Sequence, residues 1–177
     1  MRALITVLLL ATAVPAFAED APAHLYTSNS AVVVKGIGDT DATAKTDPLD
    51  LVDEIALQAS VICGDSGCAG AQTEIRIETD SSTSAALTFT PVADGLRAEV
   101  AGQPVTLALK QGETFQVRIH WNAGHRVTFD LYRTDPATGS SAMESHEVQL
   151  DSPVRDLALR ASHSQLTLLN QAYSFTR

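Results

Sequence analysis

The sequence has 177 residues, of which 45% are hydrophobic, and its 12 Lys and Arg against 21 Asp and Glu give a net charge of −9. This surplus of negative charge opposes binding to nucleic acid and to anionic membranes, because both require a positive surface. The length is typical of one ordinary domain, which can bury an apolar core without a dense framework of disulfides.

Residues 1–18 have the three parts of a secretory signal peptide. Arg2 supplies the positive charge, residues 3–14 are apolar, and residues 16–18 form a small-x-small cleavage site. The apolar stretch is shorter than the about 20 residues that a membrane span needs. We therefore expect cleavage near Ala18, a periplasmic or secreted location, and no membrane span in the mature chain.

The part of the chain that follows is predicted to contain a short lead-in and one domain. Residues 19–30 lack apolar periodicity and are interpreted as a tail or lead-in strand, whereas residues 31–177 are predicted to form a single β-sandwich domain. The β-branched run that begins at residue 31 predicts a strand.

The acidic stretch 39–53 is interpreted as a loop. Within it, the spacing of Asp39 and Asp41 could bring two carboxylates onto one calcium ion, which takes six to eight oxygen ligands. The order of residues is not that of an EF-hand, and the alternative is solvated loop charge.

Cys63 and Cys68 are the two cysteines of the chain, and in an exported protein they are expected to form a disulfide. The residues between them, 64–67, read Gly-Asp-Ser-Gly, which is similar to the surroundings of the nucleophile in trypsin-like serine proteases. A serine nucleophile needs a base, yet the one histidine that precedes Ser66 is His24. We interpret this stretch as the polar tip of a turn.

From residue 54 onward, apolar and polar residues alternate almost everywhere. Turn residues interrupt the pattern roughly every 8 to 12 positions, which is typical of a β-sandwich or barrel, and no segment after the signal peptide has the pattern of an amphipathic helix. The expected strands cover 54–62, 73–79, 85–92, 95–100, 105–110, 114–121, 127–133, 146–150, 155–162 and 165–175.

The segment 114–133 predicts a hairpin with two alternative registers. A three-residue turn at 122–124 would pair Trp121 with His125, whereas a five-residue loop would pair Trp121 with Val127. The glycine of the shorter turn can adopt the left-handed conformation of a turn-plus-bulge hairpin, which favours that turn.

The polar face of this hairpin is the main candidate binding surface. Alternation places Arg118, His120, Asp130 and Tyr132 on one side of the sheet. Such a face could hold a saccharide, with the tyrosine as a stacking platform and the two ionic residues as partners of sugar hydroxyls. The alternative is a solvated face with a cross-strand ion pair, which contributes under about 1 kcal/mol.

Trp121 is the sole tryptophan, and it ends the apolar stripe of the same hairpin. A core or rim position is the ordinary expectation for such a residue. Exposure beside Asn122 and His125 would make it a ligand platform instead.

Glu144, His146, Glu147 and His163 are the candidates for acid–base chemistry. Glycosidases need two carboxylates at a set separation, which the sequence does not fix. The two histidines occupy polar positions between apolar residues and are expected to face solvent.

The stretch "LTFTPVADGLRAEVAGQPVTLALKQGETFQVRIHWNAGHRVTFDLYR" resembles the middle of concanavalin A-like and laminin G-like domains, in which a strand and an Asp-Gly turn lead to a segment with alternating aromatic and β-branched residues. "SPVRDLALRASHSQLTLLNQAYSF" is similar to their closing strands. The resemblance covers about residues 54–177 and rests on strand rhythm. It implies two antiparallel sheets in a jelly roll, a fold commonly used to bind sugars, and it carries over no functional residue.

We therefore predict an all-β, antiparallel two-sheet sandwich of jelly-roll type with one local disulfide. The predicted function is non-catalytic binding, with extracellular or envelope glycan as the ligand, without a cofactor other than the candidate calcium ion. One alternative is a module that binds another envelope or extracellular protein. The other is a small hydrolase or lyase on the same scaffold.

Overall fold

A computed structural model of the chain describes residues 24–28, 31–36, 41–45, 49, 52–64, 67–81, 83–93 and 95–175. The predicted signal peptide, Asp39 and Ser66 lie outside these residues. The strands are β1 (His24–Ser28), β2 (Val32–Lys35), β3 (Ala42–Lys45), β4 (Glu54–Cys63), β5 (Gln72–Thr79), β6 (Ser84–Val92), β7 (Gly95–Val100), β8 (Gln103–Pro104), β9 (Phe115–Trp121), β10 (Arg126–Thr134), β11 (Ser141–Gln149), β12 (Val154–Ser162) and β13 (Ser164–Phe175).

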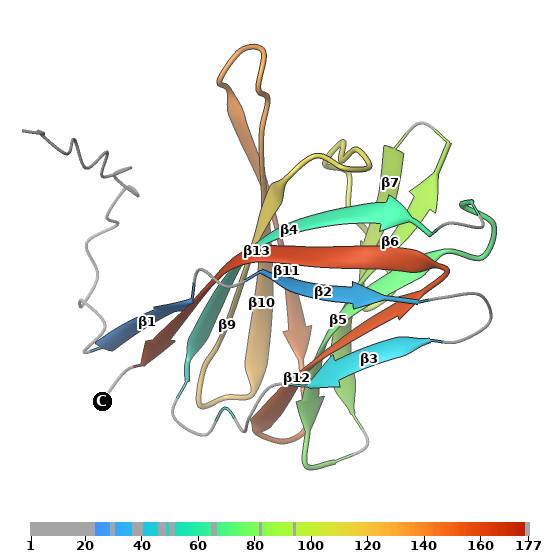
Figure 1. The fold of residues 1–177 in the computed structure, drawn as a ribbon. Helices are drawn as coiled ribbons and strands as arrows, with labels where there is room; N and C mark the ends of the chain where they lie inside the picture. The colour runs from blue at the N-terminus through green and yellow to red at the C-terminus, as the bar shows by residue number, and fades with distance from the viewer. Residues whose placement is uncertain are drawn as a thin grey trace, which may run out of the picture.

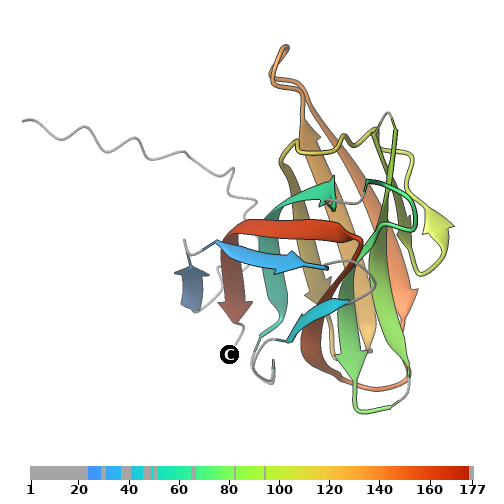
Figure 2. The same cartoon turned by 45° about the vertical axis from the view of Figure 1, so that its right-hand side comes forward.

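These strands form two antiparallel sheets that pack face to face (Figures 1 and 2). The seven-stranded sheet has the order β1-β13-β4-β9-β10-β11, with β2 also paired to β13, and the six-stranded sheet has the order β3-β12-β5-β6-β7-β8. The predicted all-β sandwich is confirmed. The described part of the chain forms no helix with the length and apolar character that crossing a bilayer requires.

The core lies between the sheets and is built from the apolar residues of the alternating pattern. Ile55 and Leu57 on β4 and Val117 and Ile119 on β9 are buried, while the residues between them are partly exposed. Burial of one such side chain contributes roughly 1.5–3 kcal/mol. The alternation therefore fixes which face of each central strand points inward.

The observed strands differ from the predicted ones in several places: β8 was not predicted, β11 begins five residues before the predicted strand 146–150, and two whole segments were assigned wrongly. Residues 42–45, interpreted as part of a loop, form β3, which pairs with β12 at the edge of the six-stranded sheet. Residues 105–110, expected to be a strand, lie beside β7 without a continuous ladder: the Val105 N–H donates to the Ala98 carbonyl at 2.9 Å, and Leu96 and Leu109 form an isolated bridge. β3 is held by main-chain pairing at the sheet edge, although its sequence has no apolar alternation. The segment after Pro104 is the opposite case, because it has apolar residues but forms no continuous ladder of hydrogen bonds.

The hairpin of β9 and β10 pairs Trp121 with Val127, so the shorter predicted turn at 122–124 is wrong. The turn does contain a left-handed residue, but this residue is His125, with φ of 58°. The carbonyl of Asn122 accepts a hydrogen bond from the His125 N–H at 3.0 Å, and its side-chain Oδ1 accepts one from the Gly124 N–H at 2.9 Å. The Asn122 side chain thus supports a hairpin of the predicted turn-plus-bulge type. Its left-handed position is occupied by His125, one residue after the Gly124 that the sequence favoured.

Ala101→Asn is expected to raise the free energy of unfolding by about 0.5–1 kcal/mol. Ala101 and Gly102 form the two-residue turn between β7 and β8, and their φ angles of 47° and 80° are both left-handed. Asn adopts this conformation at a lower cost than Ala because its side chain can form local hydrogen bonds. Urea denaturation measures the change. The matched control, Gly102→Ala, should lower stability, and a destabilising Ala101→Asn would contradict the prediction.

Candidate ligand-binding site

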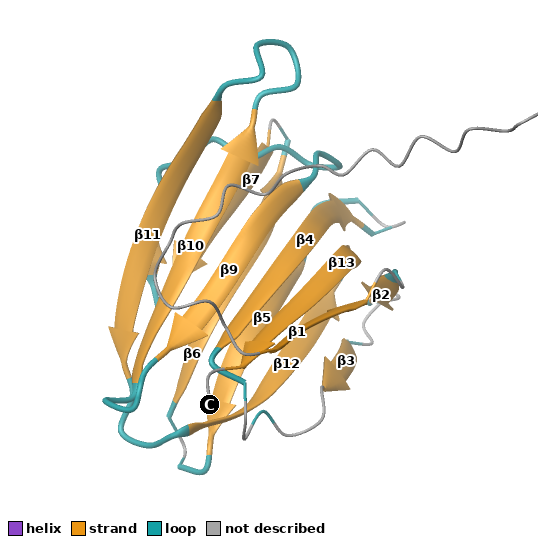
Figure 3. Cartoon of the chain, turned by 90° about the vertical axis from the view of Figure 1, so that its left-hand side faces the viewer, coloured by secondary structure: helices purple, strands orange, loops and turns teal. Residues whose placement is uncertain are grey.

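The structure brings together four of the five predicted binding residues. Arg118 and His120 on β9 lie beside Asp130 and Tyr132 on β10, and Arg118 is directly opposite Asp130 in the register. Their positions alternate with inward-facing apolar residues of β9 and β10, so they lie on the solvent-facing side of the sheet. We call this side of β4, β9, β10 and β11 the outer face; Figure 3 shows these strands in their order in the sheet.

The ionic groups of the outer face are paired with one another. Nη2 of Arg118 lies 2.6 Å from Oε2 of Glu54, and this hydrogen bond raises the pKa of Arg118. Asp130 accepts a hydrogen bond from Ser145 at 2.5 Å and lies 3.3 Å from Nε2 of His120. Burial raises the pKa of Asp130, but the hydrogen bonds from His120 and Ser145 outweigh it and lower the pKa overall. Since the Asp130 side chain is only 10% exposed, its oxygens have little access to a ligand.

Trp121 lies apart from these four residues, because its side chain belongs to the inward-facing series of β9. It is partly buried, packs against the core, and forms one wall of a pocket of about 380 Å³ at the end of the sandwich that carries the β9–β10 turn. We call this the Trp121 pocket. It is lined by Leu49, Val52, Asp53, Trp121, Asn122, Ala123, His125, Pro153 and Val154.

Main-chain hydrogen bonds connect the segments that form the Trp121 pocket. The Trp121 N–H donates to the Asp53 carbonyl at 3.0 Å, and the Leu49 N–H donates to the Arg155 carbonyl at 2.8 Å. At the rim, the Leu150 N–H donates to the His125 carbonyl at 2.9 Å. The walls come from three separate stretches of the chain, and these bonds hold them in place without a ligand. Pre-formed pockets of roughly 300–1,000 Å³ are typical of small-molecule sites.

The Trp121 pocket combines an apolar surface with a few polar groups. Trp121, Val52 and Val154 supply the apolar part, whereas Asp53 and His125 supply groups that can hydrogen-bond. A pyranose ring has a matching division, with an apolar C–H face and an edge of hydroxyl groups. An aromatic ring beside hydrogen-bonding groups can therefore bind such a ring by stacking and by polar contacts at once.

A second hollow, of about 270 Å³, lies beside the β5–β6 turn and is lined only by polar residues. Its charged groups are paired locally: Nη1 of Arg155 lies 3.5 Å from Asp80, and Nη2 of Arg76 lies 2.6 Å from Glu74. Because no apolar side chain is among its described lining residues, this hollow is a weaker candidate than the Trp121 pocket.

Of the acid–base candidates, Glu144 and His146 lie together on the inward side of β11. The prediction that His146 faces solvent is wrong, because its side chain is only 18% exposed and its Nε2 lies 2.8 Å from Oε1 of Glu144. Glu147 is on the opposite side of the strand and pairs with Arg126 at 3.2 Å. His163 is partly exposed at the one-residue link between β12 and β13.

Glu144 is an ionised acceptor rather than a proton donor. Partial burial raises its pKa, but hydrogen bonds from the Thr106 N–H, the Thr106 hydroxyl, His146 and the Leu107 N–H lower it to about 2. The general acid of a glycosidase needs a raised pKa instead. The contacts of Glu144 join β11 to the segment that follows β8, which gives the residue a structural role.

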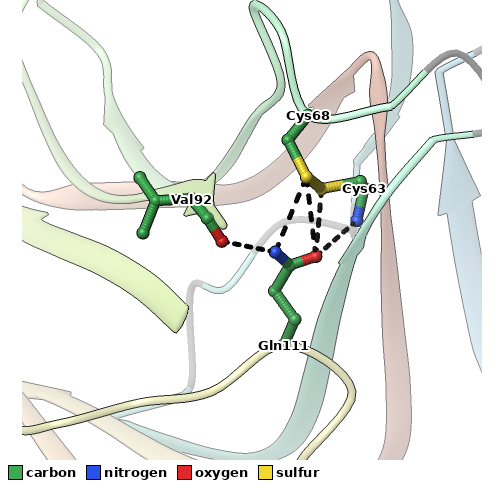
Figure 4. The surroundings of a disulfide bond; sticks show 4 residues. All are labelled: Cys63, Cys68, Val92 and Gln111. Atoms are coloured by element: carbon green, nitrogen blue, oxygen red, sulfur yellow. Dashed lines mark hydrogen bonds between the residues drawn. A yellow bond between two sulfur atoms is a disulfide. The ribbon is translucent and has the colours of Figure 1, made fainter. Parts of the chain in front are cut away.

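The predicted disulfide between Cys63 and Cys68 is confirmed. Gln111 packs against it (Figure 4): its Oε1 accepts a hydrogen bond from the Cys63 N–H at 3.2 Å, and its Nε2 donates one to the Val92 carbonyl at 2.6 Å. The same Oε1 lies 3.0 Å from Sγ of Cys63, which is an oxygen–sulfur contact because a bridged sulfur carries no proton. Gln111 thereby connects the disulfide to the end of β6.

The predicted calcium site stays a prediction. Asp41 forms an ion pair with Arg160, and the hydrogen bond from Arg160 lowers the pKa of Asp41. Asp39 falls outside the described residues. Within the part of the chain that the structure describes, no three His, Cys, Asp or Glu side chains gather in a way that could hold a metal ion.

No protein-family model matches the sequence, and no curated protein matches it. Solved structures share its fold. Lectin II from Ulex europaeus aligns with a TM-score of 0.57 and 11% identity over 89% of this chain and 100% of the lectin. The lectin UEA-II in complex with galactose aligns with a TM-score of 0.56 and 11% identity over the same shares of the two chains.

The apo Crh5 transglycosylase aligns with a TM-score of 0.58 and 11% identity over 88% of this chain and 86% of the enzyme. At such identities the likeness shows the fold alone, and it confirms the jelly-roll resemblance. Because lectins and a transglycosylase share this fold, the function has to be argued from the site.

Proposed function

We propose that this chain is an exported, non-catalytic module that binds glycan in the Trp121 pocket. The observation that carries the proposal is the position of the sole tryptophan, which is partly buried in a pocket whose rim includes Asn122 and His125. Export is supported by the signal-like residues 1–18 and by the disulfide, since disulfides persist in oxidising compartments.

The chemistry of the pocket favours a neutral saccharide over an acidic one. Asp53 is the acidic one among the described residues of the lining, and the chain as a whole carries a net charge of −9, so an anionic sugar would meet repulsion. A neutral pyranose would place its C–H face on Trp121 and its hydroxyl groups toward Asp53 and His125.

The outer face is the second candidate surface. Tyr132 lies there directly opposite Met143, a residue that is 58% exposed, and together they form an apolar spot beside Arg118. The buried Nε of Arg118 lacks a hydrogen-bond partner among the described groups. A saccharide could stack on Tyr132, but this buried nitrogen is out of its reach.

The test uses the fluorescence of Trp121, which reports on this pocket alone because the chain has one tryptophan. The protein is titrated with a panel of neutral mono- and oligosaccharides, with calcium and then with a chelator, and thermal unfolding is measured in parallel. We expect one saccharide class to change the emission in a saturable manner and to raise the Tm, since a ligand of the native state stabilises it by mass action.

His125→Gly is expected to weaken this binding about tenfold, as the loss of one well-placed hydrogen bond does. The variant should fold at least as stably as the parent, because glycine suits the left-handed backbone at this position. Tyr132→Ala is the matched control and should leave the binding unchanged. Loss of binding in Tyr132→Ala with retention in His125→Gly would move the site to the outer face.

Two further results would contradict the proposal. Cleavage or transfer of the bound saccharide, detected by chromatography of the products, would make the chain an enzyme. No response to any saccharide of the panel, with or without calcium, would overturn the proposed binding of neutral glycan and favour a protein partner.

A further inference from the structure

β11 forms one edge of the seven-stranded sheet (Figure 3). It is nine residues long, whereas the other edge strands, β1, β2, β3 and β8, have five residues or fewer. Within the described residues no main-chain group bonds to its outer side, and its sequence contains neither Pro nor Lys. Its ladder with β10 has no bulge. A long edge strand without such protection is a template for pairing with another chain.

The ladder with β10 determines which main-chain groups point to the open edge. Next to the tip of the hairpin, the Asp135 N–H donates to the Ser140 carbonyl at 2.8 Å, and at the other end the Leu150 N–H donates to the His125 carbonyl at 2.9 Å. Because hydrogen-bonded pairs alternate along an antiparallel ladder, the even-numbered residues of β11 bond to β10. The odd-numbered residues therefore direct their N–H and C=O groups outward, with Ser145 in the middle.

We propose that two copies of this chain associate through the outer edges of β11, antiparallel and with a two-fold axis at Ser145, so that their seven-stranded sheets become continuous. This inference goes beyond the proposed glycan binding and does not rest on it. A dimer of this kind is closed, because each copy offers to the other the one edge that is long and open among its described strands.

The sequence of β11 is complementary to itself in this register. On the inward side, Ala142 would lie opposite Val148 of the second copy, and Glu144 opposite its His146. No like charges face each other, and the two-fold axis repeats each pairing. Moving the axis to Glu147 would instead place two carboxylates directly opposite one another, which is destabilising. The register centred on Ser145 is therefore favoured by the charges and by the sizes of the side chains that face each other.

One strand pair is a small interface, so we expect a dissociation constant in the micromolar range. Sedimentation velocity over a concentration series from low to high micromolar should show conversion of monomer to dimer. Glu147→Pro removes an outward-directed N–H and leaves the ladder with β10 intact, because proline is tolerated where the N–H faces the open edge. We expect it to weaken dimerisation at least about tenfold with little change in Tm. Glu147→Gln, which keeps the N–H, is the matched control.

Cysteine cross-linking tests the register. Across a two-fold axis at Ser145, the two Ser145 Cα atoms would be about 5.5 Å apart, within disulfide range. Ser145→Cys should therefore form an inter-chain disulfide on mild oxidation. Met143→Cys should not, because its two copies would lie about 14 Å apart.

Three results would overturn the inference. The first is a protein that stays monomeric at high micromolar concentration, with no cross-linking of Ser145→Cys. The second is a dimer that Glu147→Pro does not weaken, which would place the interface elsewhere. The third is efficient cross-linking of Met143→Cys in preference to Ser145→Cys, which would contradict the centred register.

Discussion

Phe89→Ala is expected to lower the free energy of unfolding by about 3–5 kcal/mol. Phe89 on β6 is fully buried, and its ring centroid lies 5.0 Å from that of Phe115 on β9, with the rings tilted by 45°. Because β6 and β9 belong to different sheets, the two rings join the sheets across the core. Truncation would remove this contact and leave a cavity that main-chain pairing on both sides prevents from collapsing. Urea denaturation followed by Trp121 fluorescence measures the loss.

Two variants on the same strand serve as controls for Phe89→Ala. Phe89→Leu keeps most of the volume and should cost less than about 1.5 kcal/mol. Val92→Ala, at the exposed end of β6, should change stability by less than about 0.5 kcal/mol. If Phe89→Ala costs no more than Val92→Ala, the two sheets are not joined through this aromatic pair.

Alternation was enough to predict the central strands because each has one buried face. In β4 and β9 the apolar residues recur at every second position, and a shift by one residue would expose all of them. β3 shows the limit of this signal. Its sequence, Ala-Thr-Ala-Lys, has no large apolar residue, and the strand exists because β12 offers it a main-chain partner. Such a partner is not visible in the local sequence.

The candidate site was predictable only where its residues are close in sequence. Trp121, Asn122 and His125 belong to one turn, and their proximity was anticipated. Asp53 and Val154 reach the same pocket from other parts of the chain, through the pairing of β4 with β9 and the start of β12. The same reason applies to β11. Glu144 and His146 face inward, but their polar character in the local sequence is typical of a solvated face. Their inward position becomes clear only from the distant partner of Glu144, Thr106.

Glu144→Gln is expected to destabilise the protein by on the order of 3 kcal/mol at neutral pH. It should also make the free energy of unfolding fall less steeply as the pH is lowered. The pKa of Glu144 is lowered from 4.5 to about 2 in the folded state. Since the folded pKa lies below the unfolded one, the stabilisation is complete above about pH 4.5 and is lost as the pH falls toward about 2. The amide oxygen could still accept from the N–H groups of Thr106 and Leu107, which both donate to Oε2 at 2.8 Å, but the amide NH2 would then replace Oε1 and face the Thr106 N–H, which now donates to Oε1 at 3.0 Å.

The measurement is the free energy of unfolding in urea at a series of pH values between 7 and 2, for the parent and for Glu144→Gln. The difference between the two proteins isolates Glu144, because other carboxyl groups with lowered pKa values, such as those of Asp130 and Asp151, titrate in both. We expect the difference in the free energy of unfolding between the two proteins to shrink as the pH falls from about 4.5 toward about 2. Glu147→Gln on the same strand should show a small difference at every pH, since its partner Arg126 is exposed. Parallel curves for the parent and Glu144→Gln would mean that the carboxylate is not held ionised between the sheets, and that the segment after β8 is attached to β11 by other contacts.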